Sequence, residues 1–271
     1  MSQAIENSGN PDAQHPILAD RQDGVLTLTL NRPEQFNALS EEVLAALRAA
    51  FEDCAHDEAL RAIVVAARGR AFCAGHDLKQ MRSHAGDRDY YLSLFRQCGG
   101  LMQAIVQCPV PVIARVHGTA TAAGCQLVAS CDLAVASASA RFAVSGINVG
   151  LFCSTPAVAL TRNVSLKNAF EMLVTGRFVS AGQAQAYGLV NQVVPDDELD
   201  AAVGGLVDAI KAKSPLAVRI GKSMVRRQLG MGLEQAYEYA AEVMAGNMMA
   251  EDVGEGIDAF IEKRPPQWRG C

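Results

Sequence analysis

The sequence lacks the features that mark a membrane protein or a nucleic-acid-binding protein. It contains no apolar run long enough to cross a bilayer and no block of like charges. Its formal net charge is only -5, from 24 basic and 29 acidic residues. Neither nucleic acid nor a membrane is therefore expected as a partner, and an anionic ligand would have to be held by local groups.

The common motifs for metal ions, disulfides and nucleotides are also missing. The eight cysteines form no CxxC pair and no cluster with histidine at the spacing of metal ligands. The phosphate-binding patterns GxxxxGKS, GxxxxGKT and GxGxxG do not occur. We therefore expect no metal site, and we expect cysteines that act as small buried hydrophobic residues in a reducing compartment.

The first residues lack the signals of an exported or imported protein. Residues 1–16 have neither the apolar core of a signal peptide nor the arginines of a transit peptide, and they predict a disordered tail. Together with the reduced cysteines, this composition favours a cytoplasmic location.

Strand patterns and helix patterns alternate from residue 17 to residue 195. The segment RQDG predicts a hairpin between ILAD and VLTLTLN, and RAIVVAA, PVIARV, DLAVAS and RFAV read as strands. Residues 17–195 are thus expected to form an α/β core, and residues 196–271 a helical region. Helices in the core are predicted over residues 40–55, 90–108, 165–176 and 180–188.

Two loops rich in small residues lie between these patterns. FCAGHDLKQM, residues 72–81, follows the RAIVVAA strand, and HGTATAAGCQL, residues 117–127, follows the PVIARV strand. Each loop ends at a helix start, where backbone N–H groups have no internal partner. If the two loops face each other they form an oxyanion hole, and the alternative is a pair of tight turns that let helices pack on the sheet.

Four motifs in register carry a family resemblance. LNRPEQFNALS, GRAFCAGHDLKQM, HGTATAAGCQLVASCDLAVAS and SAGQAQAYGLVNQVV resemble the enoyl-CoA hydratase/isomerase family, also called the crotonase family, over residues 17–264. TAAGCQLVASCD and NVGLFCSTP are similar to one branch of it, that of the third mammalian enoyl-CoA hydratase domain-containing protein and its bacterial relatives.

The resemblance implies a fold, a ligand and an assembly. The expected fold is a crotonase-like spiral of strand–strand–helix units that forms two near-perpendicular sheets, with a C-terminal helical region that packs subunits into trimers or hexamers. The implied ligand is an acyl-CoA thioester from fatty-acid or related metabolism, and no cofactor is implied because CoA is part of the substrate.

By the same resemblance, two backbone amides hold the thioester oxygen. They fall on His76 and Ala123, and an alanine is acceptable at 123 only if its φ is negative. The CoA moiety is placed along Ala74 and residues 76–79, which are His76, Asp77, Leu78 and Lys79. Phe260 and Lys263 could close over the nucleotide, although ordinary packing explains them equally well.

The resemblance fails at the two acid–base positions. Hydratases of the family use two glutamates, and the aligned positions here hold Gln126 and Gly146. A glutamine side chain neither gives nor takes a proton at physiological pH, and glycine has no side chain. Other members place a reactive group near the next helix start, where Cys153 could contact the acyl group and Ser154 could cap the helix.

Two hypotheses from different classes follow. The first is an enzyme that holds a thioester enolate with His76 and Ala123 and does not depend on the missing glutamates. The second is an acyl-CoA-binding protein without hydratase turnover. Isomerisation, thioester hydrolysis and decarboxylation stay open as reactions.

Overall fold

The structure is a computed structural model that describes residues 15–271. Except for His15 and Pro16, the tail predicted over residues 1–16 lies outside the described residues. The carbonyl oxygens of His15 and Pro16 accept hydrogen bonds from Asn31, at 3.0 Å each, where the second strand ends.

A six-stranded sheet forms the centre of the fold. Its first two strands form the predicted hairpin, in which Asp23 and Gly24 both have positive φ angles of 48° and 74°, as a tight two-residue hairpin turn requires. The other strands run parallel, and every residue of the AIVVAA strand is buried. The strand order is β1-β2-β3-β5-β7-β10. The strands are β1 (Ile17–Gln22), β2 (Val25–Leu30), β3 (Ala62–Ala67), β5 (Val112–Val116), β7 (Leu133–Ser137) and β10 (Gln192–Val194).

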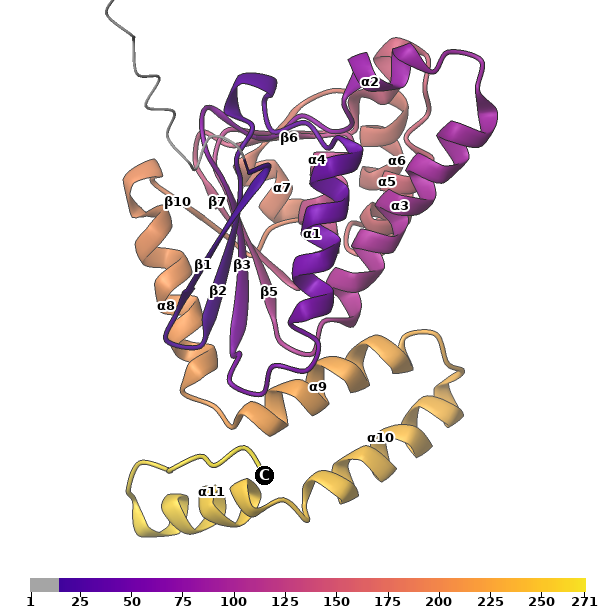
Figure 1. Cartoon of the computed structure of the whole chain (residues 1–271). Coiled ribbons are helices and arrows are strands. Elements are labelled where there is room, and N and C mark those ends of the chain that lie inside the picture. The colour runs from indigo at the N-terminus through magenta and orange to yellow at the C-terminus, as the bar shows by residue number, and fades with distance from the viewer. Residues whose placement is uncertain (1–14) are drawn as a thin grey trace, which may run out of the picture.

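A second sheet of four short strands accompanies the first. The chain passes from the large sheet to the small one three times, in the pairs β3 then β4, β5 then β6, and β7 then β8. In Figure 1 β6 runs across the ends of the long strands. The strand order is β4-β6-β8-β9. The strands are β4 (Ala71–Cys73), β6 (Thr119–Thr121), β8 (Arg141–Ala143) and β9 (Val179–Ser180).

Helices cover both faces of the large sheet. The α1 and α3 helices pack against each other on one face, and α8 packs on the other, so the sheet separates a large core from a smaller one. The Ser40 side chain caps α1, Ser180 and Gln183 form a capping box at the start of α7, and Gly188 ends that helix. The helices of this part are α1 (Glu41–Asp53), α2 (Leu78–Ser83), α3 (Arg88–Gln107), α4 (Ala123–Ser130), α5 (Ser154–Leu160), α6 (Leu166–Thr175) and α7 (Ala181–Tyr187).

Four helices make up the C-terminal region. Only α8 packs on the sheet. No residue of α9 or α10 is buried as a whole, and α10 and α11 extend away from the core in Figure 1. Ion pairs from Lys222 and Arg226 to Asp132 join α9 to the core, with N···O distances of 2.6 and 2.8 Å. The α/β class with a helical C-terminal region is confirmed. The helices are α8 (Leu199–Lys211), α9 (Pro215–Gln228), α10 (Leu233–Asn247) and α11 (Glu251–Glu262).

Candidate functional site

The two loops rich in small residues lie against each other. Part of each segment forms a short strand that the sequence did not predict, β4 in the first and β6 in the second, and the rest of the segment follows that short strand. Because β4 and β6 are parallel neighbours, both loops leave the sheet at the same edge. The facing arrangement that an oxyanion hole requires is therefore present in the fold.

Glycine makes this close approach possible at two positions. A Cβ atom on Gly75, whose φ is +92°, would lie 2.8 Å from the Ala122 Cβ and 3.2 Å from the Ala123 nitrogen. A Cβ atom on Gly124 would lie 2.2 Å from the Cys73 carbonyl oxygen. Any side chain at either position would force the loops apart.

The backbone of the second loop is strained just before α4 begins. Ala122 has φ 50° and ψ -120°, a conformation that residues with a Cβ seldom adopt, and its N–H donates to the Ala143 carbonyl at 3.0 Å. Ala123 is the first residue of the helix and is not among the residues with positive φ. The condition set for an alanine at position 123 is therefore met.

Two N–H groups at these loops have no protein acceptor. Within residues 15–271, neither the His76 nitrogen nor the Ala123 nitrogen donates a hydrogen bond. Both residues line one cavity of about 240 Å³. Two residues with unpaired backbone donors thus line a single cavity, and such donors can stabilise an oxygen that gathers negative charge.

The cavity has an apolar mouth. Its rim carries Leu78, Val149, Leu151 and Phe152, whose side chains are all exposed. Sequence reasoning missed most of this rim, although the segment VGLF that precedes Cys153 carries three of its members. The lining residues are Ala74, His76, Leu78, Met81, Phe95, Ala122, Ala123, Ser145, Gly146, Val149, Leu151, Phe152, Cys153, Ser154, Thr155 and Pro156.

The His76 ring is a poor candidate for proton transfer. Both ring nitrogens are buried without a hydrogen-bond partner, and the ring packs edge-on against Phe95 with centroids 5.6 Å apart. Burial lowers the pKa of His76, and the Leu39 backbone offsets this only in part. The imidazole is thus neutral at physiological pH and contributes packing beside its own N–H group.

Gly146 and Cys153 share one small space. Gly146 lies in a 3-10 turn, Ser145–Val149, and a Cβ atom there would lie 2.7 Å from both the Cys153 Sγ and the Leu151 carbonyl oxygen. The Cys153 side chain is buried, and burial raises the pKa of its thiol against an opposing hydrogen bond from the Gly146 backbone. The thiol therefore stands where a side chain at position 146 would begin.

The helix after Cys153 is not capped as predicted. Cys153 itself occupies the N-cap position of α5 without a side-chain bond. Ser154 is already the first helical residue, and its hydroxyl donates back to the Phe152 carbonyl at 3.4 Å. The interpretation of Ser154 as the cap is wrong, because the helix begins one residue earlier than that role requires.

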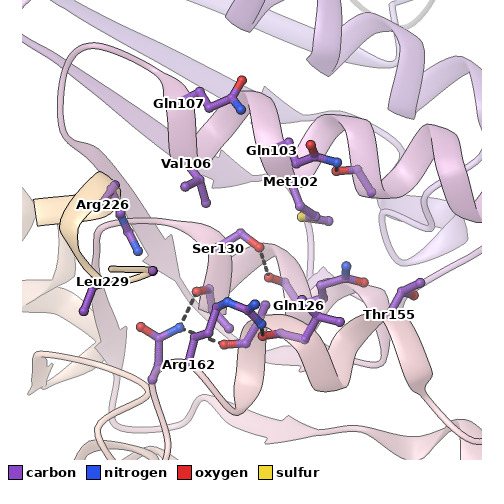
Figure 2. Close-up of a pocket in the computed structure, with 16 residues that line it drawn as sticks. Met102, Gln103, Val106, Gln107, Gln126, Ser130, Thr155, Arg162, Arg226 and Leu229 are labelled. Carbon is purple, nitrogen blue, oxygen red and sulfur yellow. Dashed lines mark hydrogen bonds between the residues drawn. The ribbon is translucent and has the colours of Figure 1, made fainter. Parts of the chain in front are cut away.

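Gln126 faces a different cavity from the two backbone donors. Its side chain is buried and lines a neighbouring space of about 550 Å³, shown in Figure 2, whereas the cavity of His76 and Ala123 does not include it. The only side-chain contact of its Oε1 is a weak one from the Cys98 thiol at 3.9 Å. Its Nε2 has no acceptor among the described residues.

The residues expected to follow the CoA moiety are only partly at the cavity. Ala74, His76 and Leu78 line it, whereas Asp77 and Lys79 do not. The Asp77 carboxylate caps α2 through the N–H groups of Lys79 and Gln80.

Lys79 is exposed at the first turn of α2. Phe260 belongs to the last turn of α11 and Lys263 is its C-cap residue. In Figure 1 the helices α2 and α11 lie on opposite sides of the molecule. Within residues 15–271 no group of three His, Cys, Asp or Glu side chains is placed to bind a metal ion.

Comparisons with known proteins agree with this fold. The family model described as enoyl-CoA hydratase/isomerase matches residues 20–271. The crystal structure of an enoyl-CoA hydratase from Mycobacterium smegmatis has a TM-score of 0.92 and 59% identity, and it covers 93% of this chain and 98% of that one. The crystal structure of human enoyl-CoA hydratase domain-containing protein 3 has a TM-score of 0.90 and 44% identity, with coverage of 93% and 100%.

A curated relative from mouse is similar over nearly the same length. It is the mitochondrial enoyl-CoA hydratase domain-containing protein 3, which is 46% identical over 248 residues, or 92% of this chain and 82% of that protein. The predicted resemblance to this branch is confirmed.

The printed names of these relatives correct one expectation. The proteins from mouse, rat and human are all named mitochondrial, so the cytoplasmic location expected from the sequence is wrong. Reduced cysteines indicate a reducing compartment, but they do not tell which of several reducing compartments contains the protein. Among the described residues, no helix is both long enough and apolar enough to cross a membrane.

The two sheets, the facing loops and the match of a family model over residues 20–271 lead to one assignment. The chain belongs to the enoyl-CoA hydratase/isomerase family.

Proposed function

We propose that this chain binds an acyl-CoA thioester and stabilises its enolate with the N–H groups of His76 and Ala123. The observation that carries the proposal is that two residues whose backbone N–H groups have no acceptor among the described residues line one cavity. Donors fixed in advance at an oxyanion are worth several kcal/mol, because they need no rearrangement when the charge develops. The exposed apolar rim provides a surface for the pantetheine chain.

Hydration of a double bond is not supported by the groups around the cavity. It requires one group to activate water and another to deliver a proton, each worth roughly 10²–10⁴ in rate. Among the described residues no Asp or Glu lines this cavity or the one beside Gln126. We therefore expect crotonyl-CoA hydration to be several orders of magnitude slower than in a member with two glutamates.

Reactions that form an enolate without a carboxylate base fit the cavity better. Decarboxylation of a 2-carboxyacyl thioester is one, because loss of carbon dioxide leaves the electron pair on the thioester enolate and only the oxyanion has to be stabilised. The second candidate function is acyl-CoA binding without turnover, which is favoured by the neutral His76 ring and the raised pKa of the Cys153 thiol.

A panel of thioesters tests both candidates. Purified protein is incubated with enoyl-, malonyl- and hydroxyacyl-CoA, and the products are followed by mass spectrometry, while thermal shift reports binding. Replacement of Ala123 with proline deletes one donor at a first helical position, where proline is tolerated. This variant should bind thioesters less well while its circular dichroism is unchanged. Absence of a thermal shift with any acyl-CoA would contradict both candidates.

An oligomer is the third part of the proposal. The C-terminal helices expose Leu229, Leu233, Tyr237, Met249 and Phe260, each at least 68% accessible. An apolar surface of this extent usually marks an interface. We expect a trimer or a hexamer, and light scattering that returns a monomer at micromolar concentration would exclude it.

A further inference from the structure

The cavity beside Gln126 adjoins the cavity at the two backbone donors. Thr155 lines both cavities, and the first turn of α4 contributes Ala123 to one and Gln126 to the other. The second cavity has a volume of about 550 Å³, within the range of small-molecule sites, and lies between α3, α4, α5 and α9 (Figure 2). The two cavities are therefore neighbours at the start of α4 and α5.

The lining of this second cavity changes from apolar to cationic. Met102, Val106 and Val158 line its walls, and the only charged residues in its lining are Arg162 and Arg226. No acidic residue lines it, although the whole chain carries a net charge of -5. An alkyl segment therefore fits the walls, and a negative group fits the cationic part.

The two arginines differ in the partners they already have. One terminal nitrogen of Arg226 binds the Asp132 carboxylate at 2.8 Å. Arg162 makes a single hydrogen bond, from Nη1 to the Val158 carbonyl at 2.7 Å, and no carboxylate pairs with it among the described residues. Nε and Nη2 of Arg162 are thus available, and Figure 2 shows this residue among the side chains that line the cavity.

We infer that this second cavity receives the acyl chain and that Arg162 binds a carboxylate at the far end of that chain. The substrate class is then a CoA monothioester of a dicarboxylic acid. Arg162 acts as a specificity-determining residue, because a guanidinium can hold a carboxylate through two parallel N–H groups. The inference rests on the proposed function, since it needs the thioester at His76 and Ala123.

Binding of matched pairs of thioesters tests the inference. Glutaryl-, adipoyl- and suberoyl-CoA are compared with pentanoyl-, hexanoyl- and octanoyl-CoA by calorimetry on the full chain. Arg162 is solvent-exposed, so a charge-assisted hydrogen bond to it should have a strength near the lower end of the usual range. The best dicarboxylic thioester should therefore bind about tenfold more tightly than its monocarboxylic counterpart. Arg162→Met should remove this preference by lowering the affinity for the dicarboxylic member of each pair.

Two further variants separate a bound carboxylate from a general charge effect. Arg162→Lys keeps the charge without the planar fork and should retain only part of the preference. Lys167→Met removes an exposed cation on α6 that lines neither cavity, and should retain all of it. Equal affinity for both members of every pair in the unmodified protein overturns the inference, as does a preference that survives Arg162→Met. Failure of every thioester to bind instead overturns the proposed function.

Discussion

Two neighbouring alanines at the second loop should respond in opposite directions to the same substitution. Ala122 is held at φ 50° and ψ -120°, which costs on the order of 1–3 kcal/mol for a residue with a Cβ. Ala122→Gly relieves this strain, but it has two costs in folding stability. Greater freedom of the unfolded chain costs about 0.5–1 kcal/mol, and loss of the partly buried methyl group costs up to about 0.8 kcal/mol. The net expectation is a stabilisation of about 0.5–1 kcal/mol.

Ala123→Gly provides the matched control one residue later. Ala123 lies in helical conformation and its side chain is only 1% exposed. Glycine there costs about 1 kcal/mol in helix propensity, and the lost methyl group adds to this cost. The two variants should thus differ by about 2 kcal/mol in the free energy of unfolding, which corresponds to about 4 °C in Tm for a chain of this size.

Calorimetry or urea unfolding at one fixed protein concentration measures this difference, because an oligomer's stability depends on concentration. Equal destabilisation by both variants would refute the reasoning, since it would mean that Ala122 is not strained. The result bears on function too, because the conformation of Ala122 sets the direction of the Ala123 N–H group.

Three other changes have defined outcomes. Lys222→Met should lower the free energy of unfolding, measured with urea, by about 3 kcal/mol. The Lys222 side chain is only 7% exposed, and its loss removes one of the cations that pair with the Asp132 carboxylate. Burial alone would raise the pKa of Asp252, but hydrogen bonds from a serine and two backbone N–H groups hold it below the ordinary value near 3.9. The stability from Asp252 is therefore present above pH ~4 and lost as the pH falls below it. The difference between the parent and Asp252→Asn should shrink in that range. Gly146→Ala should lower Tm, because the new Cβ meets both the Cys153 Sγ and the Leu151 carbonyl oxygen. Adding Cys153→Ala to that variant should restore only part of the lost Tm, since the Leu151 oxygen still contacts the new Cβ.

The long elements of the fold could be predicted because each repeats a pattern. The helix α1 buries Val43, Leu44, Leu47 and Phe51 at helical spacing, and β3 is an unbroken apolar run. The short strands β4 and β6 could not be predicted in this way. Each has three residues, too few to show a period, and small or polar residues around them resemble a loop. Their pairing is decided by the packing of the two sheets.

For the candidate site, the sequence alone indicated two loops whose backbone N–H groups are exposed before a helix, whatever their side chains are. The assignment to His76 and Ala123 came from the family resemblance, and it stays a prediction. The cavity that Gln126 faces could not be read from its spacing to Ala123, because the cavities are formed by side chains of several elements far apart in the sequence.

At position 146, where the resemblance expects a glutamate, the structure has no room for its side chain. Gly146 is not a vacant position, because the Cys153 Sγ and the Leu151 carbonyl already occupy the start of any side chain there. A carboxylate at position 146 would thus require both the turn and the thiol to move, and Gln126 on the far side would still face the arginine-lined cavity. If the proposed function and the inference about Arg162 both hold, the chain binds a thioester and its acyl group by backbone donors and distant side chains rather than by acid–base groups.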